Sequence, residues 1–333
     1  MRDYGVSVLE QYDIEVDNTR RVRGAVLCNT NKGLCLLKEM KMTPERTQFL
    51  IALYKKLEEN PYFQVDTPIE NKEGEIISQA EDGTTYILKK WYDGAECDIR
   101  KEFEVVEGAK VLAHLHNSMH LEPEESWSNK EIPEEDPLLT EYEKHNRELR
   151  KIKTFVQRRS VKGTFEREFL KHYEKMYQSA LHTYERLKES SVKSLYENAI
   201  KEHAVVHGDY NYHNILFGRN QIAVTEFSRA SYQLQLTDLY YYLRKILEKC
   251  RYDEHIGYKI LQAYDSVRPL SETEQEYLAL RLAYPEKFWK TSNLYYHSNK
   301  AWIPEKNVEK LRIAIEQREE KNSFLQQVFA FHL

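Results

Sequence analysis

The sequence has 333 residues, a mass of 39.8 kDa, 41% hydrophobic residues and a formal net charge of −5. A chain of this length and hydrophobicity usually folds as two domains or as two lobes of one large domain, which excludes wholesale disorder. The near balance of 49 Lys and Arg against 54 Asp and Glu argues against a dedicated nucleic-acid-binding protein.

Residues 1–92 are expected to form a small lobe that contains an antiparallel sheet. Residues 23–38 consist of two apolar runs around a turn rich in Asn and Gly, which predicts a β-hairpin. Thr43 and Pro44 predict the start of a helix, because Thr is a favoured N-cap and Pro fits the first helical position. Residues 76–88 predict a second hairpin. The predicted order is strand, strand, helix, strand, strand.

Residues 93–333 are expected to form a larger, mainly helical lobe. Apolar residues at helical spacing predict a helix over about 99–119, and the charged stretch 141–193 predicts a long helical insertion. Short β-type runs within 205–224 predict one small hairpin between helices. Residues 236–333 again have mostly helical patterns. The sequence therefore predicts an α+β fold with two lobes.

The most specific motif lies in this small hairpin, over residues 207–214. His207, Asp209 and Asn214 have the spacing H-x-D-x-x-x-x-N, which is typical of the catalytic loop of kinases. In phosphoryl transfer the carboxylate faces the acceptor hydroxyl, and the amide oxygen holds a metal ion that bridges the phosphates. Alternatively, Asp209 and Asn214 are turn residues that bond local backbone groups, and His207 is a buried, hydrogen-bonded histidine.

Two residues far from this motif would complete such a site. Lys38 is placed at the end of a predicted strand, where kinases carry a phosphate-binding lysine. Glu226 follows the next strand-like run after the motif, where a second metal-binding carboxylate is expected.

The same segment also suggests a different chemistry. His203, His207, Asp209 and His213 could form a zinc or iron site, since histidine and carboxylate clusters bind these metals. However, His203 and His207 share a face only on a helix, and the intervening Ala-Val-Val favours a strand. This interpretation is therefore the weaker one.

The motif and the lobe order resemble the aminoglycoside and choline phosphotransferase group of protein-kinase-like folds. Three further segments resemble the CotS-type spore-coat family of endospore-forming bacteria: Arg20–Ala25, Trp91–Asp98 and Tyr284–Lys290. The resemblance covers nearly the whole chain. It implies a two-lobed kinase-like fold with a nucleotide-binding lobe at 1–92 and a helical lobe at 93–333, which holds the catalytic loop and a metal-site segment at 224–238.

The resemblance also implies the cofactors ATP and Mg²⁺ and a role for each candidate residue. These roles are Asp209 as general base or hydroxyl-orienting group, His207 as support of the loop, Asn214 and Glu226 as metal ligands, Lys38 as a phosphate contact, and Asp238 as a brace of the catalytic loop. The chain lacks a GxGxxG loop, and Arg23 in its turn-like Arg-Gly-Ala substitute is expected to contact phosphate directly.

Two positions depart from the kinase pattern. Glu226 stands where the group has Asp, and its extra methylene matters because Mg²⁺ requires near-ideal octahedral geometry. The neutral Gln48 aligns with the carboxylate that usually pairs with the phosphate-binding lysine, although Glu45 one turn earlier could reach instead. Two hypotheses follow: a phosphotransferase that acts on a hydroxyl of a small molecule or surface polymer, or a catalytically degenerate structural or binding protein of the spore coat.

The remaining expectations concern location and partners. The four cysteines form no C-x-x-C pair, and no stretch approaches eighteen apolar residues, so we expect synthesis in the cytoplasm and no membrane partner. The resemblance adds deposition in the spore coat and coat proteins as partners. A basic stretch within residues 147–162 could dock a polyanion, but flanking acidic residues favour a solvated helical face.

Overall fold

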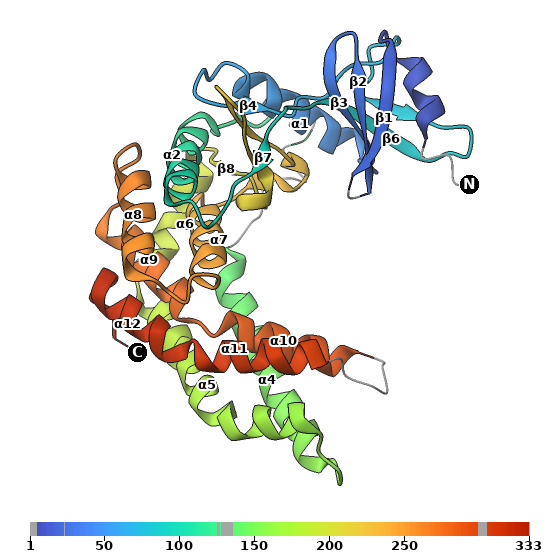
Figure 1. Ribbon diagram of the computed structural model, residues 1–333. Coiled ribbons are helices and arrows are strands. Elements are labelled where there is room, and N and C mark those ends of the chain that lie inside the picture. The colour runs from blue at the N-terminus through green and yellow to red at the C-terminus, as the bar shows by residue number, and fades with distance from the viewer. Residues whose placement is uncertain (1–4, 23, 125–126, 128–135, 299–304, 333) are drawn as a thin grey trace. The chain divides into compact units, whose positions relative to one another are not determined.

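The computed structural model describes residues 5–22, 24–124, 127, 136–298 and 305–332 (Figure 1). The chain divides into two compact units, each built from three segments. The first unit comprises Met1–Ile132, Glu202–Asp238 and Ser266–Arg268, and the second comprises Pro133–Lys201, Leu239–Asp265 and Pro269–Leu333. These units differ from the predicted lobes, 1–92 and 93–333. The predicted lobe boundary stays a prediction. Among the described helices, none is long and apolar enough to cross a membrane.

The first unit contains all the strands and two of the α-helices of the described chain. Its elements are η1 (Val6–Gln11), β1 (Val16–Val22), β2 (Ala25–Thr30), β3 (Gly33–Glu39), α1 (Pro44–Leu57), β4 (Gln64–Val65), β5 (Ile77–Gln79), β6 (Thr85–Lys90), β7 (Ala95–Glu96), α2 (Glu102–Ser118), β8 (Val205–Val206), η2 (Tyr212–Asn214), β9 (Ile215–Phe217), β10 (Ile222–Val224), η3 (Phe227–Arg229) and β11 (Ser231–Tyr232).

A five-stranded antiparallel sheet with the order β1-β2-β3-β6-β5 forms the N-terminal part of this unit (Figure 1). The predicted hairpin is confirmed as β2 and β3, in which Ala25 faces Lys38 and Thr30 faces Gly33. The second predicted hairpin is confirmed as β5 and β6. The edge strand β1 was not predicted, because its residues 17–21 are exposed and polar and so lack the apolar alternation of a half-buried strand.

The two helices of this unit begin and end close to their predicted limits. The Thr43 hydroxyl accepts a hydrogen bond from the backbone N–H of Arg46 at 3.3 Å, and Pro44 is the first residue of α1. Both features are those of a capped helix start, so the prediction is confirmed. The helix expected over 99–119 is confirmed as α2.

Two further small sheets flank the motif. β9 and β10 form a hairpin within a four-stranded sheet with the order β4-β10-β9-β7, so the predicted hairpin is confirmed only over 215–224, after the motif that was expected to lie inside it. β8 pairs instead with β11, through Ser231 opposite Val206. Residues 207–214 therefore connect two different sheets, and strands of only two or three residues carried too short a pattern to predict this pairing.

The second unit is helical. Its helices are α4 (Pro137–Arg158), α5 (Thr164–Glu189), α6 (Val192–Lys201), α8 (Glu254–Asp265), α9 (Glu272–Ala283), α10 (Glu286–His297), α11 (Glu305–Glu316) and α12 (Arg318–Phe329), and α7 (Leu236–Leu247) begins in the first unit and continues in the second.

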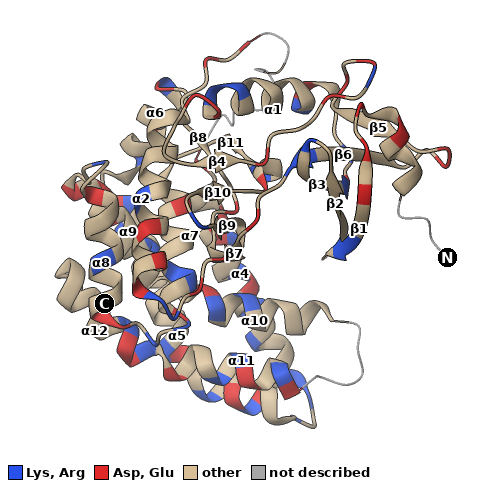
Figure 2. Ribbon diagram, turned by 45° about the horizontal axis from the view of Figure 1, so that its top comes forward, with Lys and Arg blue, Asp and Glu red and all other residues tan. Residues whose placement is uncertain are grey.

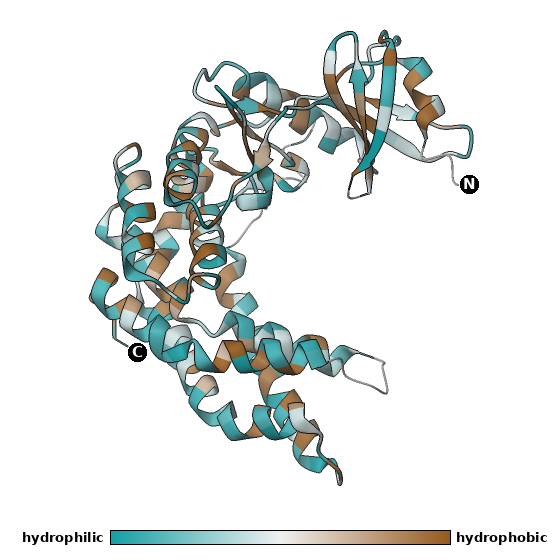
Figure 3. Ribbon diagram, in the orientation of Figure 1, coloured by the Kyte–Doolittle hydropathy of each residue, from teal (hydrophilic) through white to brown (hydrophobic). Residues whose placement is uncertain are grey.

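The helical insertion is confirmed as a pair of long helices, α4 and α5, on which α10 and α11 pack. Their shared core includes Leu149, Phe169, Tyr173, Phe288 and Leu311, all buried. Residues of both charges occur on these helices (Figure 2), and each long helix carries hydrophobic and hydrophilic residues (Figure 3). Amphipathic helices of this kind derive most of their stability from the packed face.

Candidate functional site

The second residue of the predicted catalytic loop is a glycine that no other residue could replace without strain. Gly208 has φ +78°, and a Cβ at this position would lie 2.2 Å from the carbonyl oxygen of Arg229. The Asp238 carboxylate accepts hydrogen bonds from the backbone N–H groups of His207 at 2.6 Å and of Gly208 at 3.0 Å. Hydrogen bonds of this kind hold the backbone of the loop, as the predicted role of Asp238 requires. That role itself stays a prediction.

His207 is fully buried, and both its ring nitrogens face backbone groups. Nε2 lies 2.9 Å from the carbonyl oxygen of Thr225, and the backbone N–H of Asp209 donates to Nδ1 at 3.2 Å. A neutral imidazole with the proton on Nε2 satisfies both contacts. The side chain thus links the loop to the segment that follows β10.

Asp209 and Asn214 are held together by hydrogen bonds within the loop. The Asn214 amide Nδ2 donates to the backbone carbonyl of Asp209 at 2.9 Å. The side chain of Asn211 donates to the same carbonyl at 2.8 Å and to Asp209 Oδ1 at 3.1 Å. Both predicted residues are partly exposed, so solvent or a ligand can reach them.

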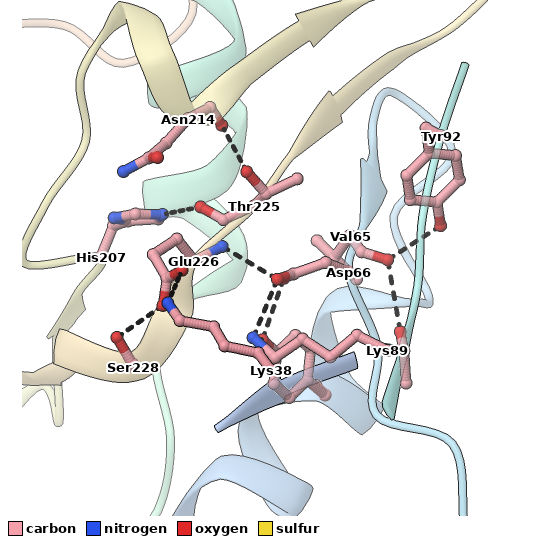
Figure 4. Close-up of polar contacts among 12 residues, drawn as sticks. Lys38, Val65, Asp66, Lys89, Tyr92, His207, Asn214, Thr225, Glu226 and Ser228 are labelled. Carbon is pink, nitrogen blue, oxygen red and sulfur yellow. Dashed lines mark hydrogen bonds and ion pairs between the residues drawn. The ribbon is translucent and has the colours of Figure 1, made fainter. Parts of the chain in front are cut away.

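Lys38 and Glu226 meet although 188 positions separate them in the chain. Lys38 Nζ lies 2.5 Å from Glu226 Oε2, and the Ser228 hydroxyl donates to Glu226 Oε1 at 2.8 Å (Figure 4). The side chains of this ion pair are 31% and 25% exposed. Burial alone would raise the pKa of Glu226, but the charge of Lys89, the contact with Lys38 and the Ser228 hydroxyl together lower that pKa to about 2. The carboxylate is therefore ionised at neutral pH.

A buried cluster that was not predicted lies behind this ion pair. Asp66 Oδ2 accepts from Lys89 Nζ at 2.9 Å and from the backbone N–H of Glu226 at 3.0 Å (Figure 4). Asp66 Oδ1 accepts from the Tyr54 hydroxyl at 2.9 Å. Burial and the charge of Asp66 keep the pKa of Tyr54 well above its ordinary value, so this hydroxyl stays protonated. Glu226 has φ +77°, and this cluster holds its backbone.

The remaining candidates lie elsewhere or outside the described residues. Arg23, the second predicted phosphate contact, lies outside them. Gln48 is exposed on α1, and the carboxylate next to Lys38 comes from Glu226 rather than from that helix. His213 Nδ1 contacts Glu96 Oε2 at 2.5 Å. Among the residues described, His, Cys, Asp and Glu form no group of three that could hold a metal ion.

Comparison with known proteins adds a decisive observation. The family described as "Spore coat putative kinase YutH" matches residues 6–328. The chain belongs to this spore-coat kinase family. The resemblance to CotS-type proteins is confirmed by a curated relative, spore coat protein S of Bacillus subtilis (strain 168). It is 26% identical over 307 residues, which make up 89% of this chain and 84% of the relative.

Solved structures show that the fold of this family member is kinase-like. An aminoglycoside phosphotransferase from Alicyclobacillus acidocaldarius is similar with a TM-score of 0.85 at 19% identity, covering 98% of this chain and 96% of its own. Amicoumacin kinase hAmiN, in complex with AMP-PNP, Ca²⁺ and Ami, is similar with a TM-score of 0.62 at 13% identity, covering 96% and 94%. The predicted α+β kinase-like fold, with a small antiparallel sheet and a mainly helical remainder, is confirmed.

Proposed function

We propose that this protein is an ATP- and magnesium-dependent phosphotransferase whose acceptor is a hydroxyl of a small molecule or surface polymer. The contact of Lys38 Nζ with Glu226 Oε2 at 2.5 Å carries the proposal. Glu226 directly follows Thr225, whose backbone N–H donates to the carbonyl of Asn214 at 2.9 Å. Thr225 also bonds to His207, so the lysine, the acid and the motif belong to one connected site.

The residues present suit a nucleotide with its magnesium ion. Glu226 offers an ionised carboxylate and Asn214 an amide oxygen, and oxygen donors are the ligands that Mg²⁺ prefers. Lys38 supplies the positive charge that phosphate groups require. When bound, the metal ion would neutralise charge on the phosphate oxygens.

Each side chain has a defined task in this proposal. Asp209 orients the acceptor hydroxyl and takes up its proton as the new oxygen–phosphorus bond forms. Lys38 binds phosphate oxygens and stabilises the charge that remains on the nucleoside diphosphate. His207 and Asp238 keep Asp209 in place through the loop backbone. Catalysis in this scheme depends mainly on positioning and electrostatics.

The relatives support the cofactors and the setting. The solved structure of amicoumacin kinase contains AMP-PNP and Ca²⁺, which supports a nucleotide and a divalent metal ion as cofactors of this protein. The spore coat relative suggests deposition in the coat, with coat proteins as partners. The identities are too low to transfer an acceptor, because acceptor choice varies widely on one fold.

One observation favours a second candidate function. Both carboxylate oxygens of Glu226 already have partners, Lys38 and Ser228, where a magnesium site would need at least one of them. A site closed in this way would suit a catalytically degenerate structural or binding protein of the spore coat.

Transfer of label from γ-labelled ATP distinguishes the two candidates. The wild type, Asp209→Asn and the matched control Asp82→Asn, an exposed turn residue, are incubated with magnesium and a panel of sugars, amino alcohols and coat extracts. We expect Asp209→Asn to lower transfer by about 10² or more and the control to leave it unchanged. Equal transfer by all three proteins would remove Asp209 from the mechanism, and no transfer by any of them would favour the structural role.

A further inference from the structure

A concave basic surface in the second unit is not used by the proposed phosphotransferase site. It is a hollow of about 670 Å³ between α4 and α10, which pack against each other. We call it the arginine hollow. Its lining contains five cationic residues and no acidic residue: Arg147, Arg150, Lys151, Arg158 and Arg159, with Thr154, Phe155 and Tyr296 beside them.

Most of these cations lack a carboxylate partner. Arg159 Nη1 is fixed by Glu166 Oε1 at 3.0 Å and by the Tyr295 hydroxyl at 3.1 Å. Among the residues described, no carboxylate forms an ion pair with any of the other four cations. Lys153, on the same helix but outside the hollow, does pair with Glu174, at 3.3 Å. The unpaired charges are thus concentrated on one face of α4.

Helix stability does not explain this concentration. A cation in the last turn of a helix is favoured by the helix dipole, but this effect falls off within one turn and covers only Arg158. Arg147 and Lys151 stand at i and i+4, and Arg147 and Arg150 at i and i+3, where like charges destabilise a helix. Charges kept at a cost to the helix indicate an anionic ligand.

The size and chemistry of the arginine hollow indicate what kind of anionic ligand fits it. Arg158 follows Arg147 by eleven positions, which corresponds to roughly 16 Å along the helix and suits several anionic groups rather than one. Arginine binds carboxylates through paired, planar hydrogen bonds. Phe155 and Tyr296 meet edge to face at 5.3 Å and are 43% and 38% exposed, so they add an apolar contact. A phosphate chain offers no apolar group to this pair.

We propose that the arginine hollow binds an acidic polypeptide segment of a partner protein, with carboxylates on the arginines and one apolar side chain on Phe155 and Tyr296. The proposal concerns α4 and α10 alone and does not depend on phosphoryl transfer. It revises the sequence-based preference for a solvated helical face at Arg147, Arg150, Lys151 and Arg158, because no carboxylate of the described residues forms an ion pair with them, in contrast to Lys153 and Arg159.

Fluorescence anisotropy of a labelled peptide, in which Asp and Glu flank one Phe, tests the proposal on the full chain. The variant Arg147→Gln/Arg150→Gln/Lys151→Gln should weaken binding about tenfold or more. The matched control Lys188→Gln/Lys193→Gln/Lys201→Gln removes the same charge from a second hollow, which is also lined by Asp136 and Glu197. It should weaken binding by less than about twofold.

Two further probes separate the possible ligands. Phe155→Ala should weaken the Phe-containing peptide but not its Ala counterpart, and because Phe155 is exposed this change leaves the fold intact. A polyphosphate chain should bind more weakly than the peptide at equal charge. Equal weakening by both triple variants, no peptide binding by the wild type at low salt, or tighter binding of polyphosphate would each overturn the proposal.

Discussion

Two of the lysine–carboxylate pairs in the first unit differ sharply in their surroundings. Lys89 and Asp66 are 2.9 Å apart, with side chains 3% and 1% exposed, and Asp66 also accepts from Tyr54 and from the backbone of Glu226. Lys38 and Glu226 are 2.5 Å apart and remain about a quarter to a third exposed. The buried pair has its hydrogen bonds satisfied inside the protein, whereas the other pair remains accessible to solvent.

This difference indicates that the two ion pairs have different roles. A buried ion pair is expensive to form but also very costly to break on one side, because the remaining charge stays buried without a partner. The pair of Lys89 and Asp66 therefore suits the task of holding Glu226 in its left-handed backbone conformation. In the proposed function, the more exposed pair is the one that binds phosphate and metal.

Breaking the buried pair should have the largest effect on stability. Lys89→Met leaves the charge of Asp66 buried and should lower the free energy of unfolding by about 3 to 5 kcal/mol. Urea denaturation at neutral pH measures this loss. The double variant Lys89→Met/Asp66→Asn removes both charges and should recover part of it. A loss no greater than that of Lys38→Met would show that the two pairs do not differ.

Removing the charge of Glu226 should have the next largest effect and should depend on pH. The pKa of Glu226 is lowered from its ordinary value of 4.5 to about 2, so its stabilisation is fully present above pH 4.5 and is lost as the pH falls toward 2. Glu226→Gln should cost about 2 kcal/mol at pH 7, after allowance for solvent screening.

The pH dependence gives the sharper test of this variant. The free energy of unfolding of Glu226→Gln should fall less steeply between pH 4.5 and pH 2 than that of the wild type. Parallel curves for both proteins over this range would contradict the assigned interaction of Glu226 with the lysines.

Lys38→Met should change stability by less than about 1 kcal/mol, because the pair is partly exposed and Lys89 continues to attract Glu226. Its effect should appear instead in ligand binding, as the loss of any stabilisation by nucleotide. Isothermal titration with ATP and magnesium measures this, with Lys55→Met on the outer part of α1 as the control. Equal nucleotide affinity in both variants would remove Lys38 from the site.

Glu226→Asp should have the smallest effect on stability, since charge is kept and one methylene is lost. The shorter side chain should loosen the contact with Lys38 and expose a carboxylate oxygen to metal. We expect the dependence of nucleotide binding on magnesium to become stronger, as measured by titration with and without the metal. Weaker magnesium dependence would show that the longer acid is adapted to this site.

Much of the fold was predictable because its local signals are strong. The Asn- and Gly-containing turn of β2 and β3 and the Thr43-Pro44 start of α1 follow from backbone chemistry alone. The polar edge strand β1 and the two-residue strands β4 and β7 carried no periodic signal. Pairing of β8 with β11 depends on contacts between residues distant in the chain, which no local pattern records.

The candidate site, like the fold, was predictable from the sequence only in part. Fixed spacing identified His207, Asp209 and Asn214, and their chemistry led to Lys38 and Glu226 in turn. Asp66 and Tyr54 remained hidden, since a single acid or tyrosine carries no spacing signal. The positively charged Lys89 at a buried position of β6, opposite Leu36, was the one available hint of an internal ion pair.

The most direct test of the central claim is the melting temperature of the wild type and Lys38→Met with millimolar ATP and magnesium. Nucleotide at a hundred times its dissociation constant should stabilise the wild type by about 2.7 kcal/mol, seen as a clear rise in its melting temperature, with no rise for Lys38→Met. An unchanged melting temperature of the wild type would contradict a nucleotide site at Lys38 and Glu226.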